Sequence, residues 1–90
     1  MSRLNVHIDG RVQGVGFRYF IVRRAQEQGL KGWVKNLADG GVSIEAVGPK
    51  GDLEDFLSYV RVGPPGARLG AVQAHWAEDE PVYKTFDVRF

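Results

Sequence analysis

The sequence predicts an α+β fold in which strands and two helices follow one another in the order βαββαβ, with a short further strand at the C-terminus. Three observations predict this fold. Apolar and polar residues alternate in several short segments, as in half-buried strands. Two other segments repeat apolar residues at helical spacing. An Asp-Gly pair separates two of the alternating segments, as in a β-hairpin. This order is typical of an antiparallel-rich sheet with both helices on one face, the ferredoxin-like sandwich.

The first half of the chain supplies a strand, a loop and a helix. Apolar and polar residues alternate over residues 4–9, which predicts a half-buried strand. Residues 10–16 contain three glycines and are expected to form a loop. Apolar residues recur at helical spacing over residues 17–28, and Gly29 is expected to end that helix.

A hairpin follows the first helix. Residues 31–36 are expected to form the second strand, and the alternation over residues 42–46 predicts the third. The turn between them, residues 38–41, contains Asp-Gly, a pair that tolerates the positive φ angles of tight hairpin turns. In the predicted topology the first and second strands run parallel with another strand between them. Their C-terminal ends are therefore expected at the same end of the sheet, roughly 10 Å apart.

The second half of the chain repeats the helix and strand pattern. Apolar residues at helical spacing predict a second helix over residues 53–60, and the Gly-Pro-Pro-Gly segment 63–66 should stop it. Alternation over residues 72–76 predicts the fourth strand. Pro81 interrupts the following segment, and residues 86–90 alternate again as a short extra strand.

The composition fits a single domain over residues 1–90. Hydrophobic residues make up 43% of the chain, enough for one core, and the absence of cysteine excludes disulfides and thiolate metal sites. The chain starts without the apolar region of a signal peptide, and no segment approaches the roughly 20 apolar residues of a membrane helix. We therefore expect a monomeric, cytoplasmic protein.

Nucleic acid is not an expected partner. The net charge is only +1, whereas nucleic-acid-binding domains usually carry a basic stripe. RNA recognition on this type of sheet would need aromatic residues on the outward strand positions. The outward positions considered are not aromatic: Asn5, His7, Ser43 and Glu45.

The start of the first predicted helix has an unusual charge pattern. Helix N-termini expose N–H groups and a partial positive charge, and they normally favour acidic residues. Here Arg18 lies in the first turn and no acidic residue appears before Glu27. A bound anion would compensate for this arginine, with the guanidinium and the main-chain N–H groups converging on it. The alternatives are a glycine-rich connection without a ligand and a solvated surface arginine.

Asn36 lies at the end of the second predicted strand, just before the turn. An asparagine in this place usually bonds the local backbone. The functional alternative is an amide that orients a water molecule. The residue by itself leaves both interpretations open.

Two segments of the chain resemble the signatures of the acylphosphatase family. The first signature is similar to Gly10-Arg11-Val12-Gln13-Gly14-Val15-Gly16-Phe17-Arg18. The second is similar to Gly32-Trp33-Val34-Lys35-Asn36, followed at the same spacing by Gly40, Val42 and Gly48. The resemblance extends over essentially the whole chain, including its length and element order.

The resemblance implies an enzyme that hydrolyses the carboxyl–phosphate bond of small acyl phosphates to a carboxylate and inorganic phosphate, without a metal or cofactor. It implies that Arg18 binds the phosphoryl group and that Asn36 orients the attacking water. The implied phosphate-binding residues are Gln13, Gly14, Val15, Gly16, Phe17 and Arg18. Vertebrate members of the family tend to carry other residues at the positions of Gly16, Tyr19 and Leu37, which bears on substrate range.

Other titratable residues are expected to have structural roles. His7 and His75 are interpreted as surface or packing residues, and their separation argues against a metal pair. Asp39 is interpreted as a turn residue. Asp9 adjoins the loop, but a carboxylate there would repel an anion, so it is not assigned to the site.

Two alternative functions stay open. One is a ferredoxin-like module that binds small anions or regulates without efficient catalysis, since fold alone does not decide function. The other follows from the resemblance, because a similar domain begins the hydrogenase-maturation carbamoyltransferases and acts there on carbamoyl phosphate. A chain that stops at Phe90, with no zinc-finger extension, favours a free-standing enzyme.

Overall fold

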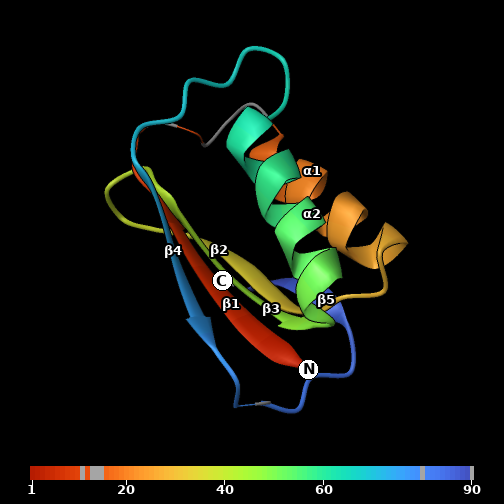
Figure 1. The fold of residues 1–90 in the computed structure, drawn as a ribbon. Coiled ribbons are helices and arrows are strands. Elements are labelled where there is room, and N and C mark those ends of the chain that lie inside the picture. The colour runs from red at the N-terminus through yellow and green to blue at the C-terminus, as the bar shows by residue number, and fades with distance from the viewer. Residues whose placement is uncertain (11, 13–15, 80, 90) are drawn as a thin grey trace.

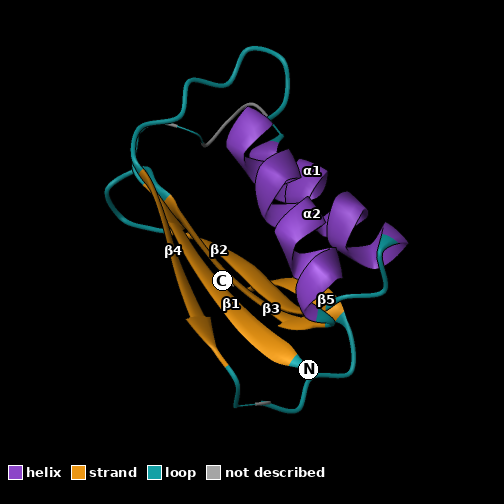
Figure 2. Ribbon diagram, viewed as in Figure 1, coloured by secondary structure: helices purple, strands orange, loops and turns teal. Residues whose placement is uncertain are grey.

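A computed structural model describes residues 1–10, 12, 16–79 and 81–89 of the chain. A five-stranded sheet carries both helices on one face, and its strand order is β4-β1-β3-β2-β5 (Figures 1 and 2). The elements in chain order are β1 (Ser2–Ile8), α1 (Phe17–Glu27), β2 (Lys31–Asn36), β3 (Val42–Gly48), α2 (Lys50–Val62), β4 (Val72–Ala77) and β5 (Phe86–Arg89). The predicted ferredoxin-like fold is therefore confirmed.

The pairing of the strands fixes which of their ends lie together. β3 pairs antiparallel with β1 on one side and with β2 on the other. Val42, the first residue of β3, pairs with both Ile8 and Asn36. The last residues of β1 and β2 therefore flank Val42 at one end of the sheet, two strand spacings or about 10 Å apart. This is the arrangement that the sequence predicts.

The core lies between the sheet and the two helices. Alternate residues of β1 point into it, and Leu4, Val6 and Ile8 are almost completely buried. They meet side chains of both helices, such as Ile21 of α1 and Phe56 of α2, which are also inaccessible to solvent. Removing most of such a buried side chain typically costs about 2–5 kcal/mol of stability.

Several boundaries differ from the predicted ones. β1 begins at Ser2, because Ser2 and Arg3 pair with the end of β3 although they break the apolar alternation. β3 continues to Gly48 for the same reason. α2 begins at Lys50, earlier than predicted. The apolar periodicity starts only at Leu53, so it could not reveal the residues before it.

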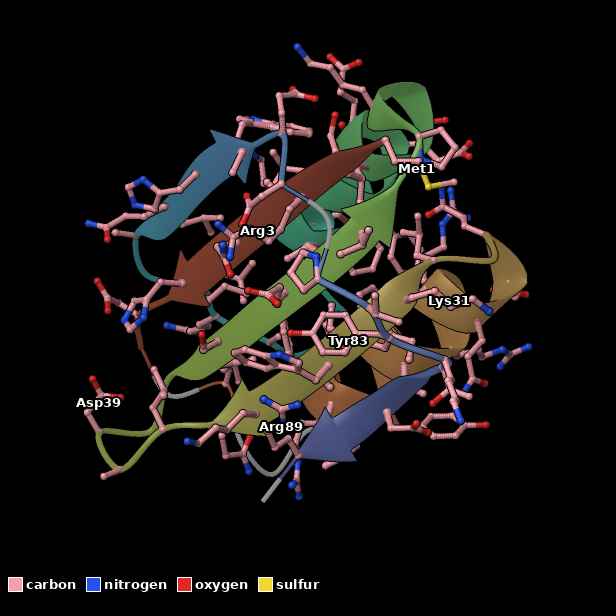
Figure 3. All side chains as sticks on the ribbon, turned by 90° about the horizontal axis from the view of Figure 1, so that it is seen from below. Met1, Arg3, Lys31, Asp39, Tyr83 and Arg89 are labelled. Carbon is pink, nitrogen blue, oxygen red and sulfur yellow. The ribbon has the colours of Figure 1, made fainter. Side chains whose placement is uncertain are left out.

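The outer face of the sheet, opposite the helices, is partly covered. Figure 3 shows this face, with the segment that carries Tyr83 crossing it. Glu45 points outward as predicted but is only 7% exposed, because the Tyr83 hydroxyl donates a hydrogen bond to its carboxylate and Arg3 lies beside it. Trp33 also lies on this face, where it adds an aromatic side chain beside the four outward positions considered in the sequence.

Candidate active site

The start of α1 lacks the usual features of a helix N-terminus. Its N-cap is Gly16, which has a φ of +70° and no side chain to cap the helix. The first turn holds no acidic residue, whereas α2 begins with Asp52 in its first turn. The main chain at the start of α1 thus offers its N–H groups without a local carboxylate to neutralise the helix dipole.

Two neighbouring residues in this first turn have different environments. Phe17 is 2% exposed and packs into the core, which anchors the helix start on the sheet. Arg18 is half-buried. The Phe20 N–H donates to the Gly16 carbonyl oxygen at 2.9 Å, so the first helical hydrogen bond closes over these two residues.

Asn36 lies on the side of the sheet that carries α1. Side chains alternate along a strand, and Val34, two residues earlier, is buried in the core between the sheet and the helices. The Oδ1 atom of Asn36 is buried and has no hydrogen-bond partner among the residues that the structure describes. Buried polar atoms are nearly always hydrogen-bonded in proteins, so such an acceptor calls for a specific explanation.

Arg18 and Asn36 are therefore brought to the same end and the same side of the sheet. β1 ends at Ile8, and the loop that follows it leads directly into α1. The start of α1 consequently lies at the end of the sheet where β1 and β2 both finish (Figure 1). α1 packs against β2, the strand that Asn36 terminates.

The loop before α1 contacts the β2–β3 turn. Val12 is fully buried in the core, and its N–H donates to the Gly40 carbonyl oxygen at 3.4 Å. Sequence reasoning did not assign Val12 to the core, because it lies between polar residues in a glycine-rich segment. Its burial shows that the loop is anchored to the protein between its two ends.

Of the predicted site residues, the structure places Gly16, Phe17, Arg18 and Asn36. The other three lie outside the described residues, and these are Gln13, Gly14 and Val15. Phe17 is directed into the core, so only its main-chain N–H is available to a ligand.

A cluster of titratable side chains adjoins this end of the sheet. His7 Nε2 and Asp9 Oδ1 are 3.0 Å apart, and ligand atoms of His7, Asp9 and Asp39 all lie within 4.8 Å of one another. The Asp39 carboxylate accepts a hydrogen bond from the Gly41 N–H at 2.9 Å, as expected of a turn residue. Sequence reasoning missed the cluster, because Asp39 is distant in the chain from His7 and Asp9 and joins them only through the pairing of β1 with β3.

The geometry defines a class of protein: a ferredoxin-like α+β domain with an arginine-bearing helix start beside a strand-end asparagine. Residues 4–88 match the family model for acylphosphatase. The chain is 50% identical to an acylphosphatase from Archaeoglobus fulgidus, and the match covers 100% of both chains. The crystal structure of acylphosphatase from Bacillus subtilis superimposes with a TM-score of 0.96 at 37% identity, again over 100% of both chains.

A larger protein contains a similar domain. A crystal structure of full-length HypF in its phosphate- and nucleotide-bound form matches 99% of this chain and 12% of its own, with 34% identity and a TM-score of 0.88.

The chain described here belongs to the acylphosphatase family, a family of hydrolases. The resemblance seen in the two sequence signatures is thereby confirmed. No helix among the described residues is long and apolar enough to cross a membrane.

Proposed function

We propose that this chain hydrolyses small acyl phosphates by a direct attack of water on phosphorus, with Arg18 and the N–H groups of residues 13–18 binding the phosphoryl group. The bond from water oxygen to phosphorus forms while the bond from phosphorus to the carboxylate oxygen breaks. The products are a carboxylate and inorganic phosphate. The phosphate takes up the oxygen of the water, and the two protons of the water stay on the phosphate or pass to solvent.

The observation that carries the proposal is the pairing of an uncapped, acid-free helix start with the buried Oδ1 of Asn36 at one end of the sheet. Phosphoryl transfer depends mainly on positioning and on stabilising charge at the equatorial oxygens. A guanidinium and converging main-chain N–H groups supply that stabilisation. The Oδ1 of Asn36 is an acceptor for the attacking water, which it can hold in line with the leaving group.

No general acid is required in this reaction. The leaving carboxylate departs without being protonated, so the titratable cluster of His7, Asp9 and Asp39 has no step to perform in it. The guanidinium of Arg18 and the main-chain N–H groups take the place that a metal ion holds in other phosphoryl-transfer sites, so the proposed reaction uses no metal ion or other cofactor. Substrate and inorganic phosphate are the partners that we propose, for a monomer that works in the cytoplasm without nucleic acid.

The acyl group has a place to extend beside the site. A hollow of about 420 Å³ adjoins the start of α1, and Gly16 is part of its lining. Tyr19, which is 70% exposed, lies in the same lining together with Phe20 and Tyr59. The charged residues Arg23 and Glu27 complete one side of the lining, and the aromatic part of it supports substrates with an apolar acyl group.

The direct test is hydrolysis of benzoyl phosphate by the purified protein, measured as the release of inorganic phosphate. We expect turnover that disappears in the double variant Arg18→Gln/Asn36→Ala. Tight phosphate binding with no turnover by the wild-type protein would instead favour the small-anion-binding module and overturn the proposal.

A further inference from the structure

We infer that Asp39 is a positioning residue, which holds the β2–β3 turn so that Asn36 is correctly placed. This inference rests on the proposed role of Asn36 in orienting water. It assigns a catalytic consequence to a side chain that sequence reasoning interprets only as part of a turn.

The turn of residues 37–41 begins directly after Asn36. The Leu37 N–H donates to the Gly41 carbonyl oxygen at 2.9 Å, and the Gly40 N–H donates to the Leu37 carbonyl oxygen at 3.2 Å. Asp39 closes the far side of this turn, because its Oδ1 accepts the Gly41 N–H at 2.9 Å. The Asp39 side chain therefore holds Gly41 in place. Gly41 in turn accepts the hydrogen bond from Leu37, the residue that follows Asn36.

Gly41 lies so close to the end of β1 that a side chain does not fit there. A Cβ atom at this position would lie 2.5 Å from the Ile8 carbonyl oxygen and 3.1 Å from Asp39 Oδ1. Gly41 is buried between these two groups. The next residue, Val42, pairs with both Ile8 and Asn36. Gly41 thus adjoins the residue that pairs with the last residues of both β1 and β2.

The same turn also reaches the proposed phosphate-binding loop. The carbonyl oxygen of Gly40 accepts the Val12 N–H, and Val12 is fixed in the core. Val12 fastens the loop independently of Asp39, since its side chain is fully buried. Loss of the Asp39 carboxylate should therefore disturb Asn36 more than the phosphate-binding residues that follow Val12.

A hydrogen-bond acceptor is all that this role needs. Asparagine keeps the Oδ1 acceptor and forms the same type of turn, whereas alanine removes it. The two substitutions of Asp39 consequently separate the acceptor from the negative charge.

The test combines kinetics on benzoyl phosphate with binding of inorganic phosphate. We expect Asp39→Ala to lower kcat by about tenfold, because small displacements of a positioning group have large kinetic effects. The dissociation constant of inorganic phosphate should stay within about twofold, and Asp39→Asn should restore kcat to within about twofold of wild type. Asp55→Ala, at an exposed position on α2, is the matched control and should change neither quantity.

A double-variant comparison shows whether Asp39 acts through Asn36. In the Asn36→Ala background, adding Asp39→Ala should leave kcat unchanged, because residues that act as a unit are non-additive. A further tenfold loss in that background would overturn the inference, as would a kcat of Asp39→Asn as low as that of Asp39→Ala. If Asp39→Ala does not fold, Asp39→Gly also lacks the acceptor and suits a turn, and wild-type kcat in that variant would also overturn the inference.

Failure of this inference is distinguishable from failure of the proposed function. An unchanged kcat in Asn36→Ala would overturn the proposed role of Asn36 itself. A reduced kcat in Asn36→Ala together with an unchanged kcat in Asp39→Ala would overturn only the role of Asp39.

Discussion

The indole Nε1 of Trp33 donates a hydrogen bond to the hydroxyl oxygen of Tyr83 at 3.2 Å, which links β2 to a segment fifty residues later in the chain. The same hydroxyl donates to the carboxylate of Glu45 on β3. The Arg89 guanidinium lies 4.9 Å from the centre of the Trp33 ring (Figure 3). A polar network on the outer face of the sheet therefore connects β2, β3 and β5 with the segment that carries Tyr83. It lies on the face opposite the proposed active site.

This network predicts an alkaline loss of stability. The pKa of Tyr83 is raised above its ordinary value of 10.0, mainly by the hydrogen bond to Glu45 and secondly by burial. A raised pKa in the folded protein means that the contribution to stability is complete below pH 10 and is lost as pH rises through the folded pKa. Urea unfolding at several pH values from about 9 to 11 should show this decline in wild type and a shallower one in Tyr83→Phe. Equal slopes would exclude Tyr83 as its source.

Replacing Arg18 with glutamine should weaken phosphate binding. Charge-assisted hydrogen bonds contribute about 1.5–3 kcal/mol each, so calorimetry should show roughly ten- to hundredfold weaker binding of inorganic phosphate. Lys31→Gln, at the opposite end of β2 from Asn36, changes the net charge equally and should leave the affinity unchanged. An Arg18→Gln variant with wild-type affinity would remove Arg18 from the site.

Replacing Asn36 with alanine should act mainly on turnover. The attacking water loses its proposed acceptor, so kcat should fall by about 100-fold while binding of inorganic phosphate is nearly unchanged. Steady-state kinetics on benzoyl phosphate measures the change. A rise in KM with an unaltered kcat would show that Asn36 binds the substrate and does not hold water.

Chelation should leave the activity unchanged. Neither the leaving carboxylate nor the bound phosphoryl group requires a metal ion in the proposed reaction. The assay is hydrolysis of benzoyl phosphate after prolonged treatment with EDTA. Activity that is lost on chelation and regained with a divalent cation would contradict the metal-free mechanism, and His7→Ala would then test whether the cation lies at the cluster with Asp9 and Asp39.

Removing the Tyr19 ring should discriminate between acyl groups. In Tyr19→Ala, KM for benzoyl phosphate should rise by about two- to tenfold, as loss of an aromatic contact predicts. KM for acetyl phosphate should stay within about twofold, because its methyl group is too small to reach across the hollow. Equal effects on the two substrates would show that the hollow does not receive the acyl group.

The elements around the candidate site could be predicted from the sequence because local signals mark them. A glycine, a buried aromatic residue and an arginine announce the start of α1, and an Asp-Gly turn fixes where Asn36 ends β2. The topology predicted from the order of the elements then implies which strand ends meet. The two side chains proposed for catalysis follow from those local signals together with the family signatures.

Features that depend on distant contacts could not be predicted. Residues 78–85 have no periodic pattern, yet Tyr83 in this segment makes Glu45 a buried residue. Asp39 joins His7 and Asp9 through the pairing of β1 with β3, and no local signal connects Asp39 with the other two. Hydrogen-bond partners of this kind are set by tertiary structure, which a single sequence does not display.

The parallel pairing of β5 with β2 has a consequence for handling the protein. β5 covers the outer edge of β2. The Gly32 N–H also donates a hydrogen bond at 2.9 Å to the carbonyl oxygen of Thr85, the residue that precedes β5. If this short strand detaches, the main-chain groups of β2 become a template on which another molecule's strand can add. Self-association on mild destabilisation should therefore start at β2. Because Asn36 is the last residue of this strand, activity should be lost before precipitation becomes visible.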